Sequence, residues 1–191
     1  MIRRAFLFGE LRVAEESDVE RSLVTRTQDA RRLFVLLALS STALRRVALG
    51  IRLWPDTPDE VRRARLRYSL AMLRRAVGDE VILSIGADAL TLSAEVTVDV
   101  RLFWEQVQAA VLAPVPDLRI EVLQAALRLA RSPFLNGWSE PWVVQERNRL
   151  EACQRDVVRA LAADLTRLGR EEEAMLWQHL ISANDVLTPG L

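Results

Sequence analysis

The first 25 residues carry a pattern of apolar and polar positions that is typical of short strands. The segment 6–13 is apolar and then alternates, and Leu23 with Val24 gives a second, weaker strand pattern. A helical pattern follows over 29–39, where the apolar residues recur at helical spacing: Ala30, Leu33, Phe34, Leu37 and Ala38. The chain is therefore predicted to begin as strands and to enter its first helix near residue 29.

A second helix and a hairpin are predicted on either side of a longer third helix. Thr42 is expected to cap the second helix, in which Gly50 costs about 1 kcal/mol relative to alanine. The hairpin is predicted where the apolar segments 81–85 and 89–93 flank a short Gly-Ala-Asp turn.

The third helix has the clearest predicted borders, at 59–77. Thr57 is expected to be its N-cap and Pro58 its first residue, and Glu60 completes a capping box with Thr57. Gly78 is expected to end the helix. The buried stripe repeats at helical spacing and consists of Leu66, Leu70, Leu73 and Val77.

From residue 99 the pattern is helical throughout. Successive helices are predicted over 100–112, 118–131, 141–168 and 171–183. Asp117 is expected to cap the second of these. We place a domain boundary near residue 98, so that 1–97 form an α+β module and 98–191 an all-α module.

Composition narrows the class of protein. Apolar residues make up 50 % of the chain, the 26 basic residues are all arginine and balance 26 acidic ones, and there is one cysteine. These values exclude a disordered chain, a disulfide framework and a cysteine-rich zinc site. The longest uncharged run, 33–44, is shorter than the roughly 20 residues that a membrane span needs. We therefore expect a cytoplasmic protein that is not in the membrane.

The zero net charge hides a basic segment. Residues 21–78 hold 13 arginines against four acidic residues, whereas the segments before and after it carry an acidic surplus. Chance clustering is the simpler interpretation. The functional one is an anion-binding face, because clustered charge promotes association with polyanions.

The order of three helices and a hairpin is that of a winged helix-turn-helix fold, whose third helix enters the major groove of DNA. Arg65 and Tyr68 lie mid-helix, where base edges are expected, and Arg63, Arg67 and Arg74 share a flank that suits a phosphate strand. The predicted contacts on this helix are Arg62, Arg63, Arg65, Arg67, Tyr68 and Arg75. The secondary phosphate candidates are Arg31, Arg32, Arg45 and Arg46. A solvated amphipathic helix is the alternative.

No catalytic, metal or cofactor site is predicted, and we do not expect an enzyme. Cys153 and His179 lack a third polar group that would orient them, so we expect a buried structural cysteine and a surface histidine. Four tryptophans are expected to be core anchors: Trp104, Trp138, Trp142 and Trp177. Trp54 is expected to plug the turn between the second and third helices, and a phosphate contact through its indole N–H is the alternative.

Two groups of motifs make the chain similar to a known family. The first group resembles the OmpR-type winged helix of actinobacterial antibiotic-regulatory activators and consists of Leu53–Asp56, Leu66, Leu73–Gly78 and Val96–Val100. The second resembles the bacterial transcriptional activator domain that follows it in that family and consists of Ala126–Leu135, Trp142–Leu150 and Leu168–Ala174.

The resemblance implies a DNA-binding transcriptional regulator with a tetratricopeptide-like helical domain. It implies double-stranded DNA as a partner, with two copies on repeated sites, and RNA polymerase as a partner of the loop 54–58. Relatives continue through further helix pairs, whereas this chain ends one pair in. An apolar face is therefore expected near Ala183, which suggests either a homodimer through the helical domain or a truncated chain.

This sequence departs from its relatives in two places. The two positions before Leu73 are usually Ser or Arg and then Arg in relatives, but here they are Ala71 and Met72, whose side chains donate no hydrogen bond. The wing carries acids and no cation before Arg101: Asp79, Glu80, Asp88, Glu95 and Asp99. Two functions are therefore open, a DNA-binding regulator or a protein-interaction module that keeps the winged-helix fold as a scaffold.

Overall fold

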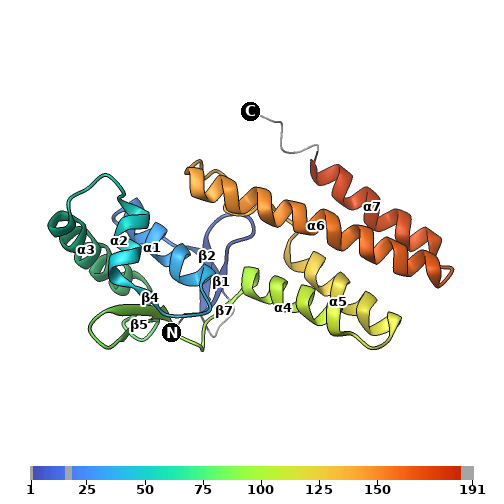
Figure 1. Cartoon of the computed structure of the whole chain (residues 1–191), viewed down its shortest axis with the longest axis horizontal. Helices are drawn as coiled ribbons and strands as arrows, with labels where there is room; N and C mark the ends of the chain where they lie inside the picture. Colours follow the sequence, from blue (N-terminus) through green and yellow to red (C-terminus); the bar gives the residue numbers. More distant parts are fainter. Residues whose placement is uncertain (1, 16–18, 186–191) are drawn as a thin grey trace. The chain divides into compact units, whose positions relative to one another are not determined.

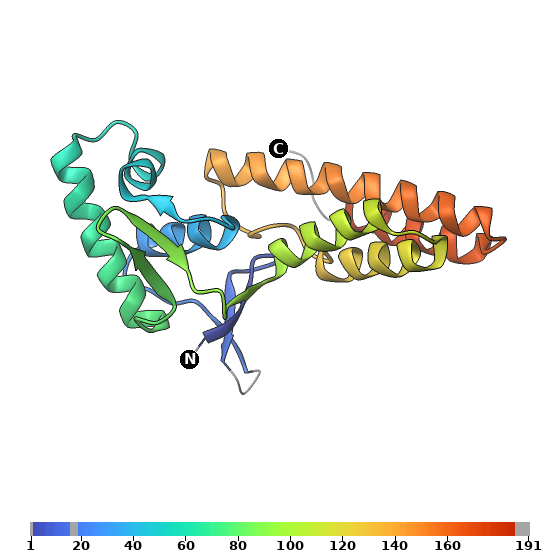
Figure 2. The same ribbon diagram turned by 60° about the horizontal axis from the view of Figure 1, so that its bottom comes forward.

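The structure is a computed structural model that describes residues 2–15 and 19–185. Its contacts divide the chain into two compact units, the first made of residues 1–7 and 11–101 and the second of residues 8–10 and 102–191. Figures 1 and 2 show the helices and strands of both units. Within the described ranges, no helix is long and apolar enough to cross a membrane.

The first unit contains a sheet that joins the beginning of the chain to its last strand. The strands are β1 (Ile2–Phe6), β2 (Arg12–Glu15), β3 (Glu20–Ser22) and β7 (Thr97–Val98). Their order in the sheet is β3-β2-β1-β7, with β1 antiparallel to β2 and parallel to β7. The pairing of β1 with β7 closes the unit around the helices that lie between these strands in the sequence.

The strand predictions for this region have the wrong borders. The predicted strand 6–13 is the end of β1, a turn and the start of β2, because Gly9 has a φ of 89° and reverses the chain there. The strand predicted at Leu23 and Val24 lies earlier, as β3. Leu23 is buried and its amide donates to the Leu11 carbonyl at 3.2 Å, whereas the Val24 side chain is exposed.

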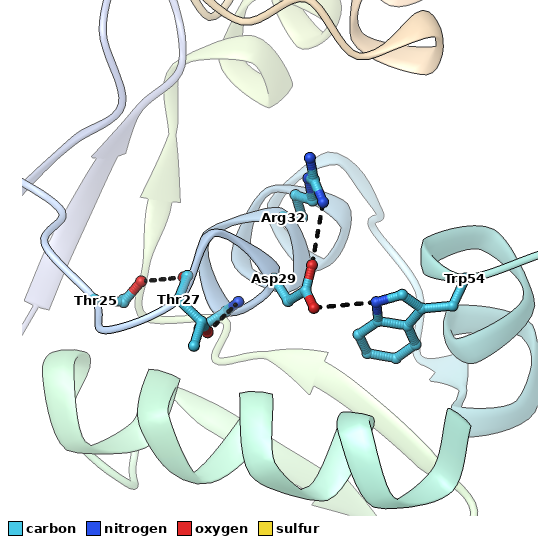
Figure 3. Close-up of polar contacts among 6 residues, drawn as sticks. Thr25, Thr27, Asp29, Arg32 and Trp54 are labelled. Carbon is cyan, nitrogen blue, oxygen red and sulfur yellow. Dashed lines mark hydrogen bonds and ion pairs between the residues drawn. The ribbon is translucent and has the colours of Figure 1, made fainter. Parts of the chain in front are cut away.

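Three helices follow, α1 (Gln28–Leu39), α2 (Arg46–Leu53) and α3 (Asp59–Val77). The prediction of a helix over 29–39 is confirmed, and every side chain from Leu33 to Ala38 is buried. The first turn of α1 is capped by Thr27, whose hydroxyl accepts a hydrogen bond from the Ala30 amide at 3.3 Å (Figure 3). α1 is thus the helix on which α2 and α3 pack.

The first turn of α4 (Asp99–Leu112) anchors the first unit. Asp99 is buried, and both of its carboxylate oxygens lie 2.9 Å from the Leu7 amide nitrogen, which donates to them. The Arg101 guanidinium donates to the Leu37 and Ala38 carbonyls at 2.8 and 2.7 Å, at the C-terminal end of α1. These charge-assisted bonds satisfy backbone groups that the helix and strand ends leave unpaired.

The predicted N-terminal caps of α2 and α3 are wrong. The residues after Thr42 stay extended as β4 (Leu44–Arg45) because they pair with β6 (Ala89–Leu92), so α2 begins only at Arg46. α3 spans the predicted 59–77, but Pro58 holds its N-cap position and no side chain caps it, which rules out the capping box of Thr57. Gly78 ends α3 as predicted, with a φ of 101° and its amide bonded to the Arg74 carbonyl.

The predicted hairpin is confirmed as β5 (Ile82–Ile85) and β6, which form a sheet with β4 in the order β4-β6-β5. Gly86 has a φ of 58° in the turn between β5 and β6. Arg74 of α3 holds the hairpin, because its Nη2 donates to the Ile82 carbonyl at 2.9 Å and to the Ser84 hydroxyl at 3.2 Å. The hairpin is therefore attached to α3 by a side chain as well as by its covalent link.

The second unit is helical, with α4 followed by α5 (Pro116–Leu129), α6 (Pro141–Arg167) and α7 (Glu171–Asp185). Asp117 does not cap α5. The helix begins at Pro116, one residue before Asp117, and Val115 holds the N-cap position. Packing of α6 against α5 and α7 forms the core, whose buried residues are Ala110, Ile120, Leu123, Leu127, Val157, Val158, Leu161, Ala162, Leu165 and Ala174. The apolar face expected near Ala183 lies outside the side chains that the structure describes.

The loop between α5 and α6 is held by Arg147, which donates to the carbonyls of Phe134 and Leu135 at 2.7 Å and of Trp138 at 2.9 Å. The four tryptophans of this unit are only half-buried, so the prediction of core anchors overstated their burial: Trp104, Trp138, Trp142 and Trp177. Cys153 is likewise half-buried against the core, and His179 is exposed as predicted.

Alanine substitutions at two glycines of the first unit are expected to change the free energy of unfolding in opposite directions. Gly50 is helical, and a Cβ there would lie 3.5 Å from the Cβ of Arg62, an ordinary contact, so Gly50→Ala should raise the free energy of unfolding by about 0.5–1 kcal/mol. Gly78 has the left-handed backbone of a helix end, so Gly78→Ala should lower it by at least as much. Urea unfolding of both variants measures the two changes, and a destabilising Gly50→Ala would contradict the helical packing of α2 on α3.

Candidate nucleic-acid interface

The exposed side of α3 is the basic face of the first unit. The stripe of Leu66, Leu70, Leu73 and Val77 is buried as predicted, which turns the intervening positions outward. The predicted contacts that lie exposed on this side are Arg63, Arg65, Arg67, Tyr68 and Arg75. Tyr68 keeps 52 % of its surface accessible. α3 thus presents cations and one aromatic ring on a single side.

Arg62 differs from the other predicted contacts on α3. Its side chain is only 18 % exposed and pairs with Asp59 one turn earlier. The hydrogen bond from Arg62 holds the pKa of Asp59 below its ordinary value, and the positive charge of Arg62 acts in the same direction. Arg62 therefore stabilises the first turn of α3, and its charge is largely balanced within the unit.

Arg74 does not take part in the flank that was predicted for a phosphate strand. Arg63 and Arg67 are exposed, whereas the Arg74 guanidinium is engaged by the hairpin. Of the two positions that depart from relatives, Ala71 is exposed and Met72 is half-buried. The donor-free positions therefore interrupt the exposed arginine face near the end of α3.

The secondary phosphate candidates lie in three different settings. Arg45 is exposed in β4. Arg46 is half-buried at the start of α2, where its Nη2 donates to the Ser84 hydroxyl at 3.0 Å and its Nε is buried without a hydrogen-bond partner. Arg31 and Arg32 are half-buried on α1, and Arg32 pairs with Asp29 at 3.1 Å. Among these four arginines, only Arg45 has an exposed side chain, as the outward arginines of α3 do.

The loop between α2 and α3 is fastened to α1 through Trp54. The indole Nε1 of Trp54 donates to one carboxylate oxygen of Asp29 at 3.1 Å, and Arg32 donates to the other at 3.1 Å (Figure 3). Trp54 is buried, so the prediction that it plugs this turn is confirmed, and its N–H is already used within the protein. Pro55 and Asp56, which follow it, are exposed.

A concave surface lies between α2, the first half of α3 and the hairpin turn, with a volume of about 490 Å³. Four arginines line it: Arg46, Arg62, Arg63 and Arg67. Sequence spacing separates Arg46 from the α3 arginines, because nothing in it shows that the start of α2 meets α3. Ser84 was missed altogether, since its contacts with Arg46 and Arg74 join residues 38 and 10 positions away.

The acids of the hairpin segment have separate roles. Asp99 is buried and bonded to Leu7, so it is a structural residue and does not belong to an acidic surface. Glu95 pairs with Arg3 and Asp79 with Arg74, the latter at 3.9 Å, and Glu80 and Asp88 are exposed. The exposed negative charge of the hairpin is therefore smaller than the composition indicates.

Among residues 2–15 and 19–185, no group of three or more histidine, cysteine or acidic side chains is placed to hold a metal ion. Burial raises the pKa of the Cys153 thiol, with the negative charge of Asp156 as a second cause, and both disfavour the thiolate.

The contact between Trp54 and Asp29 can be measured by a double-mutant cycle. Trp54→Phe removes the indole donor but keeps most of the buried ring, so it should lower the free energy of unfolding by about 1–3 kcal/mol. Asp29→Ala removes the acceptor. Because the two changes delete one shared bond, the double variant should lose less stability than the sum of the single losses in urea titrations. Additive losses would show that this bond contributes nothing to stability.

Comparison with known proteins adds two similarities. Residues 98–184 match the family model of the bacterial transcriptional activator domain. The structure is similar to that of Mycobacterium tuberculosis EmbR, solved in complex with a low affinity phosphopeptide, with a TM-score of 0.71 and 22 % sequence identity over 94 % of this chain and 51 % of that chain. The chain thus spans about half the length of that structure, and no curated protein matches it. The protein therefore shares its fold with part of EmbR and is similar to the bacterial transcriptional activator domain over residues 98–184.

Proposed function

We propose that the chain is a DNA-binding transcriptional regulator, in which residues 1–97 act as a winged helix-turn-helix domain and residues 98–191 as a helical activator domain built of tetratricopeptide-like pairs. The observation that carries the proposal is the outward face of α3, which holds exposed arginines and no acid between Glu60 and Asp79. The match of residues 98–184 to an activator domain supports it. A positive helix beside a hairpin has the charge and the shape that a duplex groove accepts.

The exposed residues of α3 take two roles in this proposal. Arg65 and Tyr68 lie at the middle of the helix and reach base edges in the major groove. Arg63, Arg67 and Arg75 lie beside them and contact phosphates, joined by Arg45 from β4. The half-buried candidates, Arg31, Arg32, Arg46 and Arg62, contribute charge to the face and fewer direct contacts.

Two protein partners belong to the same proposal. The loop 54–58 exposes Pro55 and Asp56 next to the anchored Trp54, which makes it a rigid segment suited to contact RNA polymerase. A homodimer through the helical domain would place two copies of α3 on repeated half-sites.

A second function, a protein-interaction module without DNA binding, is favoured by a different observation. Ala71 is exposed within the arginine face, and the hairpin turn exposes Asp88 where a groove-binding wing usually carries a cation. In that case the helices and hairpin of the first unit would serve as a scaffold.

Duplex DNA titrations at several salt concentrations separate the two functions. If α3 contacts phosphates, fluorescence anisotropy should give an affinity that falls with log salt at a slope of about −0.9 per contact. Arg159→Ala serves as the control for the loss of one arginine, because Arg159 is exposed on α6 and pairs with Asp156 of the same helix. Absence of binding to any duplex, including the region upstream of the protein's own gene, would favour the interaction module.

Base and phosphate contacts are expected to respond differently to mutation. Arg65→Ala should reduce the ratio of affinities for a preferred and an unrelated duplex by about 10-fold or more, since a bidentate base contact contributes about 1–3 kcal/mol of discrimination. Arg45→Ala should weaken both duplexes alike and reduce the salt slope by about one contact. The same anisotropy assay measures both variants, and equal losses of discrimination would contradict the assignment of Arg65 to bases.

A further inference from the structure

We propose that the concave surface between α2, α3 and the hairpin turn is a binding site for a small phosphate-bearing molecule, and that its occupant competes with DNA. The second part of this statement rests on the proposed function, whereas the first part stands on the geometry of the site alone. This site, the arginine pocket, is lined by four arginines and two aspartates: Arg46, Arg62, Arg63, Arg67, Asp59 and Asp88.

The arginine pocket has the size of a ligand site. Its volume of about 490 Å³ lies within the roughly 300–1,000 Å³ that is typical of small-molecule sites. Three separate elements surround it, since Arg46 and Gly50 come from α2, Arg67 from α3 and Asp88 from the hairpin turn.

The charges of the pocket favour an anion. Asp59 is paired with Arg62, which leaves Arg46, Arg63 and Arg67 facing the single carboxylate of Asp88. Two positive charges thus stay unbalanced in one hollow. A phosphate group matches this surplus because it carries nearly two negative charges at neutral pH and accepts several hydrogen bonds from guanidinium groups.

Arg46 supplies the most specific feature of the pocket. Its Nη2 is held by the Ser84 hydroxyl at 3.0 Å, so the orientation of the guanidinium is set by the hairpin. Arg46 lines the pocket, and a guanidinium that is already held in one orientation loses less conformational freedom when it binds an anion.

Competition with DNA follows from the residues that the two ligands share. Arg63 and Arg67 line the pocket and also belong to the exposed side of α3 that is proposed to contact phosphates. A bound dianion would neutralise these guanidinium groups and remove their attraction for the duplex. The regulator would then release DNA when the small molecule is abundant.

The pocket is tested by isothermal titration calorimetry of the full chain with inorganic pyrophosphate, without divalent cations and at constant ionic strength. Saturable binding is expected for the unmodified protein. Arg46→Gln should weaken it by at least 10-fold, whereas Arg26→Gln, which removes the same charge from an exposed position outside the pocket, should leave it unchanged. No saturable binding, or equal weakening by the two variants, would overturn the proposal.

A second variant fills the pocket and keeps every arginine. A Cβ at Gly50 meets Arg62 at ordinary contact distance, and Gly50 itself lines the pocket, so Gly50→Leu places a larger side chain in the hollow. This variant should lose pyrophosphate binding by at least 10-fold while its thermal unfolding stays cooperative. Unchanged binding by a folded Gly50→Leu would also overturn the proposal, and Arg46→Gln decides the case if Gly50→Leu does not fold.

Competition with duplex DNA distinguishes the two phosphate groups that could occupy the pocket, those of a small molecule and those of the duplex backbone. Pyrophosphate should displace labelled DNA from the unmodified protein at constant ionic strength, and Arg46→Gln should resist that displacement. If Arg46→Gln reduces the salt slope of DNA binding by about one contact while pyrophosphate does not bind, the pocket serves the duplex backbone and the free-ligand proposal is wrong. If pyrophosphate binds as expected but no duplex binds, the proposed phosphate site is supported and the proposed DNA-binding function is contradicted.

Discussion

Burial of the leucine stripe of α3 against α1 is the constraint on which the rest of the first unit depends. α1 is enclosed from Leu33 to Ala38, so it offers the apolar surface that the stripe covers. Once Leu66, Leu70 and Leu73 face the core, the helical period turns Arg65, Tyr68 and Arg75 outward. Arg63 and Arg67 lie at the border of the stripe in the first half of α3 and are exposed there. The basic face is therefore a consequence of core packing. It would be lost if α3 rotated by one residue, because the leucines would then be exposed and the arginines buried.

A set of polar contacts keeps the ends of these elements in place around that core. Trp54 ties the end of α2 to Asp29, Arg101 covers the last carbonyls of α1, and Arg74 holds the hairpin. Arginine suits these positions because its planar guanidinium donates several hydrogen bonds in fixed directions. The arginine-only composition thus serves the interior of the fold as well as its surface. Arg74 and Arg101 donate to backbone carbonyl oxygens, whereas Arg63, Arg65 and Arg67 are exposed on α3.

The same division bears on function. Arg74 and Arg101 are engaged by backbone carbonyls, whereas Arg63, Arg65, Arg67 and Arg75 are exposed on α3, and Arg63 and Arg67 also line the arginine pocket. The hairpin contributes Asp88 to that pocket and no cation, so the charge of α3 dominates the recognition surface. A regulator of this design would depend on one helix for most of its affinity for DNA. Occupation of the pocket by an anion would then have a large effect on that affinity.

The sequence by itself determined the helices, the hairpin and the exposure of four of the six α3 arginines, because apolar periodicity and glycine stops are local properties. Tertiary structure decided which residues cap the helices and which groups the arginine side chains contact. Thr42 does not cap α2 because β4 pairs with β6, and Thr57 does not cap α3 because Pro58 holds the N-cap position. The contact of Arg46 with Ser84 joins elements 38 residues apart, and no spacing rule encodes such a pair. Long-range hydrogen bonds form only after the core has packed, so the arginine face was predictable from the sequence and the arginine pocket was not.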